Sequence, residues 1–301
     1  MILNHTSMSV CRNRWTVFLS CIFLSSVVTA QRIDLDLFGG FSNYQGDLQP
    51  KFFTLHKANP GAAIFIKYGI TENLFVRAGF SVGSIAADDA DNRKELQQRN
   101  LNFRSGLREF SAGLEYRFFS PEQHRFTPYV FISAGVFKYK PYTYYGGEKI
   151  FLQPLGTEGQ GLPQKPGTEL YSLTQFSIPY GLGVKYQINC NLNIGIEFRH
   201  TKAFSDYLDD VSSTYVDQAA LLHVRGQTAV DVAWRGDEFN GAPYPASGSR
   251  RGNPEQGDWY YFTGITIGLR LKDCISGRFS LGGIFNRNSS ANGSRIDCPK
   301  F

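Results

Sequence analysis

Alternation of apolar and polar side chains runs through most of this chain and limits what it can fold into. From Leu74 to Gly83, every second residue is apolar, and the other face carries mostly small or polar residues such as Arg77 and Ser81. A period of two residues is that of a β-strand with unlike faces. Almost no helical periodicity competes with it. We expect eight strands, within 32–43, 61–70, 74–83, 110–118, 127–139, 178–187, 192–199 and 264–271.

The connections between these segments alternate strictly between long and short. Three are short, near 71–73, 120–125 and 189–191, and four are long, at about 44–60, 85–103, 140–171 and 202–257. In an up-and-down barrel this order places all long loops at one rim and all tight turns at the other. Bacterial outer-membrane barrels have this arrangement. The sequence therefore predicts an all-β, eight-stranded antiparallel up-and-down transmembrane β-barrel with long extracellular loops and short periplasmic turns.

The side chains of the more polar face indicate which face meets lipid. A secreted barrel of lipocalin type would have an apolar interior. Here the polar face is mostly Gly, Ser and Thr with single charges, which suits a narrow lumen better than a solvated surface. Its five acids and six bases nearly cancel, as a sealed interior requires. This expected lumen charge network consists of Asp34, Asp36, Glu109, Glu115, Glu197, Lys67, Arg77, Arg117, Lys185, Arg199 and Arg270.

Aromatic residues on the opposite face lie towards the strand ends, which is typical of the interfacial girdles of membrane barrels. We expect such girdles at Tyr68, Tyr116, Phe118, Tyr186, Phe198 and Tyr261. An eight-stranded barrel has an interior that side chains just fill. A diffusion pore is therefore not expected, and neither is a small-molecule substrate or a cofactor.

The first thirty residues have the pattern of a secretory signal. Two arginines precede an apolar stretch from Trp15 to Val28, and small residues up to Ala30 predict cleavage before Gln31. A lipoprotein signal at Cys21 is the alternative, although the apolar run continues beyond that cysteine. We expect a signal peptide at 1–30, the barrel at 31–271 and a periplasmic tail at 272–301, in the bacterial outer membrane.

Charge and motif searches give no case for catalysis or for nucleic-acid binding. The net charge of +5 is spread along the chain without a basic block. Candidate bases His56, His200 and His223 lie in or near long loops, and Ser205 and Asp206 follow His200, but catalytic geometry is spatial rather than sequential. The third long loop has no phosphate-binding Gly-Lys-Ser/Thr pattern. We expect no enzyme here.

Two further groups of residues are candidates for structural roles. The acidic cluster Asp206, Asp209, Asp210 and Asp217 does not match a calcium loop, so turn capping is the favoured role. Three cysteines follow the predicted cleavage site, at the short-turn rim or in the tail: Cys190, Cys274 and Cys298. The alternatives are Cys190–Cys274 or Cys190–Cys298, with the remaining tail cysteine either linked to a partner or inert.

Several loop segments together resemble a known family. They are Ser42 to Leu48, Gln153 to Gly161, Tyr171 to Pro179, Asp206 to Ser212, Arg251 to Pro254, Asp258 to Tyr260 and the ending Cys298 to Phe301. This combination resembles the PorG-like outer-membrane barrels of the type IX (Por) secretion system, although the tail from Lys272 is longer than is usual there.

The resemblance implies a non-enzymatic outer-membrane component of a protein secretion apparatus. It implies a periplasmic lipoprotein ring subunit as the partner, docked or anchored to the membrane through this barrel, with outer-membrane lipid around it. Two alternatives remain. One is an adhesion or binding barrel that acts through its long loops, and the other is a lipid-modifying barrel enzyme.

Overall fold

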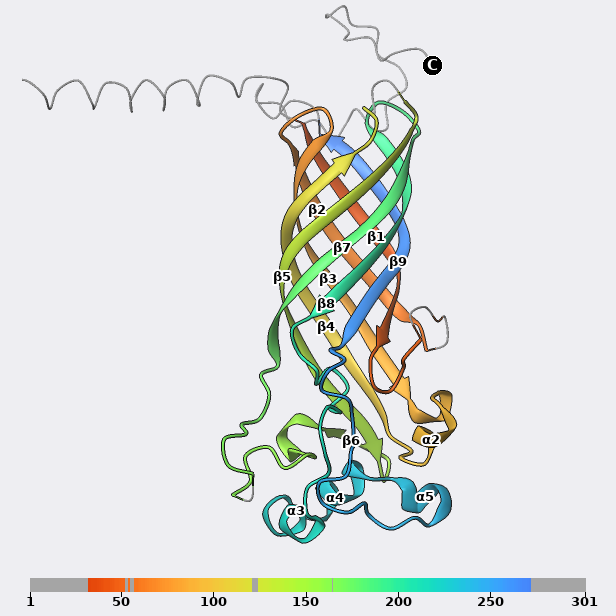
Figure 1. Cartoon of the computed structure of the whole chain (residues 1–301). Helices are drawn as coiled ribbons and strands as arrows, with labels where there is room; N and C mark the ends of the chain where they lie inside the picture. Colours follow the sequence, from red (N-terminus) through yellow and green to blue (C-terminus); the bar gives the residue numbers. More distant parts are fainter. Residues whose placement is uncertain (1–31, 52–53, 55–56, 121–123, 164, 272–301) are drawn as a thin grey trace, which may run out of the picture.

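The described part of the chain contains nine strands, eight of which close into a barrel (Figure 1). The computed structural model describes residues 32–51, 54, 57–120, 124–163 and 165–271. The predicted signal peptide (1–30), Gln31 and the predicted tail (272–301) lie outside these ranges. The strands are β1 Ile33–Gln45, β2 Asn59–Gly69, β3 Leu74–Asp88, β4 Asn102–Arg117, β5 Phe126–Tyr145, β6 Glu148–Phe151, β7 Thr174–Gln187, β8 Leu192–Ala203 and β9 Trp259–Leu271.

Antiparallel pairing between sequence neighbours closes the barrel. Each strand pairs with the next, with β5 followed by β7, and β9 pairs with β1 from Ile33 opposite Leu271 to Gln45 opposite Trp259. The short strand β6 extends the sheet beside the outer part of β5. The closed eight-stranded antiparallel barrel predicted from the alternation is thus confirmed.

The strands are longer than the predicted segments, mainly at the end that carries the long loops. β5 has 20 residues and β4 has 16. Their pairing continues to Arg104 opposite Tyr142, well past Phe110 and Val136, the last pair of outward-facing apolar residues. Each strand gives the other a hydrogen-bonding partner there, so both remain extended beyond the length that a bilayer requires.

Short helices in the long loops were not expected from the sequence. They are α2 Lys94–Gln97, α3 Gln218–Arg225, α4 Gln227–Ala233 and α5 Gly236–Asn240, with 3-10 turns at Asp89–Asp91 and Gln153–Leu155. Figure 1 shows α3, α4 and α5 together at the end of the molecule farthest from the short turns. None of the described helices is long and apolar enough to span a membrane.

The exterior of the barrel is apolar. Phe110, Phe176 and Ile196 each expose 60% or more of their surface, and further large apolar side chains alternate along every barrel strand. Of the predicted girdle residues, Tyr116, Phe118 and Tyr186 are exposed. Tyr261 is an exception because it is buried under the first long loop, where its hydroxyl donates to the backbone oxygen of Thr54 at 2.7 Å.

The interior is both charged and aromatic. Its charged side chains lie mainly towards the short turns, and buried rings such as Phe65, Phe131 and Phe262 fill the middle. The sequence indicated small residues for this face, and the structure shows what many of them do. Gly61 and Gly83 lie opposite each other on β2 and β3, and a Cβ on either would lie 2.8 Å from the Phe262 ring. These glycines leave room for an aromatic ring.

Candidate functional site

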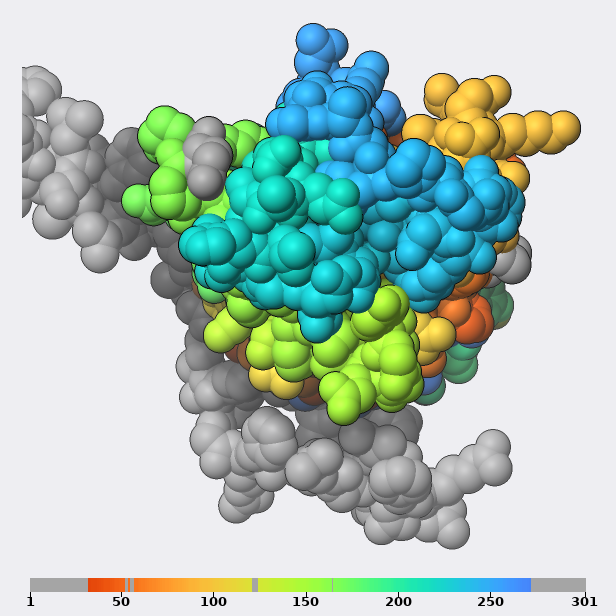
Figure 2. Space-filling view, turned by 90° about the horizontal axis from the view of Figure 1, so that it is seen from below, coloured from red at the N-terminus to blue at the C-terminus, as the bar shows by residue number. Residues whose placement is uncertain are grey.

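Packed loops close the barrel at the end opposite the short turns. We call this part the loop cap: residues 46–50, 89–101, 152–163, 165–171 and 205–258. Figure 2 looks at this end and shows the third and fourth long loops covering the barrel mouth. Large side chains of the cap such as Leu208, Val211 and Leu221 are buried. The loop cap is therefore an ordered continuation of the barrel core.

Glu158 is the centre of polar contacts in the loop cap. Its buried carboxylate accepts hydrogen bonds from the backbone N–H groups of Ser212 at 2.8 Å and Ser213 at 2.9 Å. The guanidinium of Arg251 binds the same carboxylate at 3.1 Å. Three segments that are distant in sequence therefore converge on one side chain.

Arg251 joins this centre to a second buried acid, Asp210. The two side chains lie 3.7 Å apart, and Asp210 also accepts hydrogen bonds from the hydroxyls of Thr157 at 2.5 Å and Tyr171 at 2.7 Å. Burial raises the pKa of Asp210 to about 6, although Arg251 opposes this shift. Buried acids that are paired and hydrogen-bonded hold such loops in a single arrangement, because leaving either partner alone is costly.

Tyr44, at the end of β1, lies between two buried carboxyls. Its hydroxyl oxygen is 2.6 Å from Oδ2 of Asp209 and 2.7 Å from Oδ1 of Asp258. A phenol has only one proton to donate. The second short contact therefore requires a proton on one of the carboxyls, which then donates to the tyrosine oxygen. Burial raises the pKa of both Asp209 and Asp258 well above the ordinary value, and their mutual repulsion raises that of Asp258 further.

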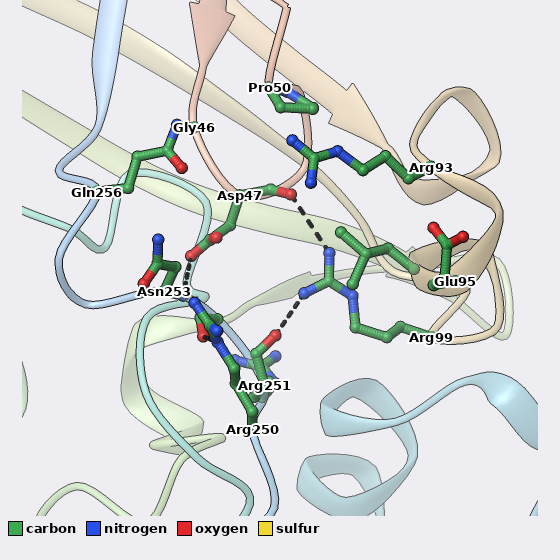
Figure 3. Close-up of a pocket in the computed structure, with 12 residues that line it drawn as sticks. Gly46, Asp47, Pro50, Arg93, Glu95, Arg99, Arg250, Arg251, Asn253 and Gln256 are labelled. Carbon is green, nitrogen blue, oxygen red and sulfur yellow. Dashed lines mark hydrogen bonds between the residues drawn. The ribbon is translucent and has the colours of Figure 1, made fainter.

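A cavity of 520 Å³ opens on the flank of the loop cap, beside α2 (Figure 3). Four arginines contribute to its lining, and two of them are paired with buried acids. Arg99 is buried and pairs with Asp89 at 2.7 Å, and Arg251 binds Glu158. Arg93 and Arg250 are exposed, and Nε of Arg250 donates to the backbone oxygen of Gly252 at 2.7 Å. In Figure 3 the carboxylate of Asp47 points to Asn253, whose backbone N–H donates to it at 2.9 Å.

The structure brings most of the expected lumen charges into one buried network. Lys67 contacts both Asp36, at 2.6 Å, and Glu115, while Lys185 reaches Asp36 at 2.8 Å. Arg77 binds Glu197 at 2.6 Å. Arg117 binds Asp34 at 2.8 Å and Glu115 at 3.0 Å, and Arg270 lies 3.5 Å from Asp34.

The remaining two lumen charges have hydroxyl partners instead. Glu109 accepts a hydrogen bond from Ser177 at 3.0 Å, and Arg199 donates one to Ser81 at 2.8 Å and lies over the Phe262 ring. These two residues lie nearer the loop cap than the rest of the network. The charged interior is thus divided into an ionic part near the short turns and a sparser part among aromatic rings.

The histidine and serine candidates for catalysis are engaged in separate contacts. His200 Nδ1 is 3.0 Å from the Tyr180 hydroxyl, and its ring stacks on Trp259. Ser205 contacts the Tyr139 hydroxyl at 3.2 Å instead. His223 is exposed on α3, and His56 lies outside the described residues. Within the described part of the chain, no group of three or more His, Cys, Asp or Glu side chains is arranged to hold a metal ion.

Two further predicted groups have defined positions. Asp217 is the N-cap of α3, where it accepts from the backbone N–H of Ala220 at 2.9 Å. Cys190, in the turn between β7 and β8, is disulfide-bonded. Cys274 and Cys298 lie outside the described residues, so the choice between them remains a prediction.

Sequence reasoning missed the main contacts of the loop cap. Tyr44, Glu158, Arg251 and Asp258 were noted only within short motifs, and nothing in the sequence indicated that they meet. The available signal was the motifs themselves, because each of these residues belongs to one of the loop segments that carry the family resemblance.

Comparisons with known proteins give one family and several distant barrels. Residues 13–223 match the family model described as Domain of unknown function (DUF6089). No curated protein matches the chain. Among solved structures, Ail of Yersinia pestis is 11% identical, with 81% of this chain and 100% of that chain covered and a TM-score of 0.39.

Neisserial surface protein A is 9% identical, with coverages of 81% and 98% and a TM-score of 0.38. The outer membrane protein OprG from Pseudomonas aeruginosa is 9% identical, with coverages of 81% and 98% and a TM-score of 0.35. Identities this low carry no information about function. The family match, in contrast, extends over well more than half of the sequence, and the chain belongs to the DUF6089 family.

Proposed function

We propose that this protein is a non-enzymatic barrel of the bacterial outer membrane that acts as an anchor. The observation that carries the proposal is the distribution of side chains around the barrel wall. Ionised groups such as Lys67 and Glu115 are buried inside, while Phe110, Leu182 and Ile196 are exposed outside. Such an exterior is stable in lipid and would promote aggregation in water.

An anchoring role follows from the filled interior and the capped mouth. Side chains from all barrel strands occupy the lumen, so the surfaces that can contact soluble partner proteins are the two ends. The short-turn end is compact and presents the described turns at 70–73 and 188–191. The loop end is large and ordered. Two ends of different construction suit an anchor, which binds a partner at one end and fixes its position in the membrane.

Within this role, we assign the protein to a type IX secretion apparatus, where it docks a periplasmic lipoprotein ring subunit. The support is the sequence resemblance to PorG-like barrels, together with the chain order that puts the predicted tail at the short-turn end. On this proposal the short turns and residues 272–301 form the periplasmic contact surface.

The test is crosslinking in intact cells, followed by purification from the outer membrane and mass spectrometry of attached proteins. An affinity tag can be placed at the exposed Gly146–Gly147 turn, away from the short turns. We expect a ring lipoprotein with the full chain and its loss after deletion of 272–301. An unrelated tagged barrel is the matched control. Recovery of no ring subunit with the full chain would contradict the secretion role while leaving the membrane location standing.

A second function, recognition of an external ligand by the long loops, is favoured by the cavity beside α2. Arg93 and Arg250 are its exposed cations, and a rigid barrel that carries ordered loops is a common recognition scaffold. If this is the main role, replacing both arginines by serine changes surface binding of whole cells but leaves protein secretion intact. A secretion defect without a change in binding decides for the first proposal.

A further inference from the structure

A group of five basic side chains lies on the outer wall of the barrel. We call it the basic patch: Arg104, Arg108, Lys138, Lys140 and Lys149. All five are exposed, and they come from the neighbouring strands β4, β5 and β6. None of the five side chains donates a hydrogen bond or forms an ion pair within the described part of the chain. The lumen charges, by comparison, are almost all paired.

The strand register places like charges next to each other in this patch. Arg108 lies directly opposite Lys138 on the neighbouring strand, and Lys140 is the next outward residue along β5. Like charges directly opposite in a sheet are destabilising. An anion bound between them would remove this repulsion, so the arrangement favours a negatively charged partner.

Aromatic rings hold two of the lysines in place. The Nζ atom of Lys140 lies 3.7 Å from the centre of the Phe151 ring, and Nζ of Lys149 lies 3.7 Å from that of Tyr142. A cation over an aromatic face is weakly attracted and loses part of its freedom. These two ammonium groups are therefore partly ordered before any partner binds, which lowers the entropic cost of binding.

The patch begins where the apolar band of the wall ends. Phe110 is opposite Val136, and the next outward pair towards the loops is Arg108 opposite Lys138. Along β5, the outward residues from Phe126 to Val136 carry no charge. Ten residues at about 3.3 Å each, in a strand tilted by about 40°, rise about 25 Å, close to the apolar height of membrane barrels. The basic patch thus lies at the level of lipid headgroups on the loop side.

We infer that the basic patch binds the phosphate groups of a phosphorylated glycolipid in the outer leaflet. The same molecule would place its acyl chains on Phe110, Val136 and Phe176, which are exposed immediately below the patch. A soluble acidic partner would contact only the basic side chains and would leave the exposed apolar side chains below them without a partner. The inference rests on the proposed outer-membrane location and names the lipid class that the wall selects there.

Equilibrium binding of labelled lipid A to the purified full chain in a neutral detergent tests the inference. The probes are lipid A with two phosphates and the same lipid without them. Replacing Lys138 and Lys140 by glutamine should weaken binding of the phosphorylated lipid by about 25-fold, at about five-fold per cation near a lipid surface. The dephosphorylated lipid should bind both proteins equally weakly.

The matched control replaces two exposed loop lysines outside the patch, Lys51 and Lys94, by glutamine and should bind like the unchanged chain. Heat-dependent migration in detergent gels shows that each variant is a folded barrel. If the patch variant binds phosphorylated lipid A as tightly as the unchanged chain does, the inference is overturned. Displacement of the lipid by an equal concentration of inorganic phosphate also overturns it. These binding assays use purified protein, so their outcome does not depend on where the protein lies in the cell. The membrane location is tested separately, by cell fractionation.

Discussion

Tyr44 illustrates how a single proton can hold distant segments together. Its hydroxyl contacts Asp209 and Asp258, which are 165 and 214 residues away in sequence. Asp209 also accepts from the backbone N–H of Val211, and Asp258 from that of Leu208. The shared proton therefore joins the first strand, the fourth long loop and the start of the last strand. Its loss would leave two anions side by side without a cation in contact.

This shared proton predicts that the loop cap is less stable at alkaline pH. Burial raises the pKa of Asp206 from 3.8 to about 7 and that of Asp210 to about 6, and those of Asp209 and Asp258 are raised as well. Above pH 4 the folded cap therefore binds more protons than the unfolded loops, so its free energy of unfolding falls as pH rises. Each extra bound proton contributes a slope of about 1.4 kcal/mol per pH unit.

Protease cleavage of the loops under native conditions measures this dependence. We expect slower cleavage at pH 5 than at pH 8, and a flatter dependence in Asp258→Asn, which keeps a neutral partner for Tyr44. Asp237→Asn, on the exposed end of α5, should behave like the unchanged chain. Cleavage rates that do not change with pH would contradict the shared proton.

At the scale of elements, interior glycines and aromatic rings fit each other across the barrel. Gly61 on β2 and Gly83 on β3 lie beside the ring of Phe262 from β9. The same relation holds for Gly183 and Tyr129, where an added Cβ would lie 2.4 Å from the ring. Glycine weakens an isolated strand. Here that loss is offset because a larger side chain from another strand fills the space.

This fit predicts a substitution pattern. Gly61→Ala should destabilise the barrel by about 1–3 kcal/mol, because the new methyl group overlaps a ring in a packed interior. Adding Phe262→Leu should restore part of the loss. Gly106→Ala is the control, since no atom lies within 4 Å of its added Cβ. Unfolding by urea in detergent micelles measures all three. An equal change in stability for both alanine variants would show that ring packing does not govern position 61, because backbone entropy alone favours alanine over glycine at either position.

The sequence predicted the strands well and the helices not at all, and the physical reason is periodicity. Alternation depends only on which face of a strand is apolar, so it is readable from residues two apart. The helices α3, α4 and α5 have five to eight residues each, which is too short for a helical period to show. α3 and α4 are stabilised by burial of Leu221, Val230 and Val232 in the loop cap rather than by their own pattern.

At the scale of the whole molecule, charge balance in the lumen and packing of the cap make the interior a solid core. Lys67 and Lys185 share Asp36 and Glu115, so neither of these two acids depends on a single base. The lumen residues could be predicted because strand parity assigns them to one face. The contacts of the cap could not, because Glu158 and Arg251 approach only after the barrel has set the positions of their loops.

A filled interior predicts the absence of steady ion conduction. The full chain inserted into planar lipid bilayers should show no stable open level at any moderate voltage. An eight-stranded barrel leaves space only for side chains. Truncating Arg77 and Phe65 together to alanine removes two large side chains that pack on each other in the middle, and this variant is the positive comparison. Stable conductance by the unchanged chain would contradict the packed lumen.

The length of β5 has a consequence for what can touch this protein from outside. Nine residues of the strand continue past Val136, and at about 3.3 Å per residue and a tilt of about 40° they rise roughly 20 Å. In the membrane orientation that we propose, this stiff part of the sheet therefore holds the helices at the tip well above the lipid headgroups. A soluble molecule that approaches this end contacts α3 to α5 first. The backbone hydrogen bonds between the strands keep these helices at a fixed distance from the barrel.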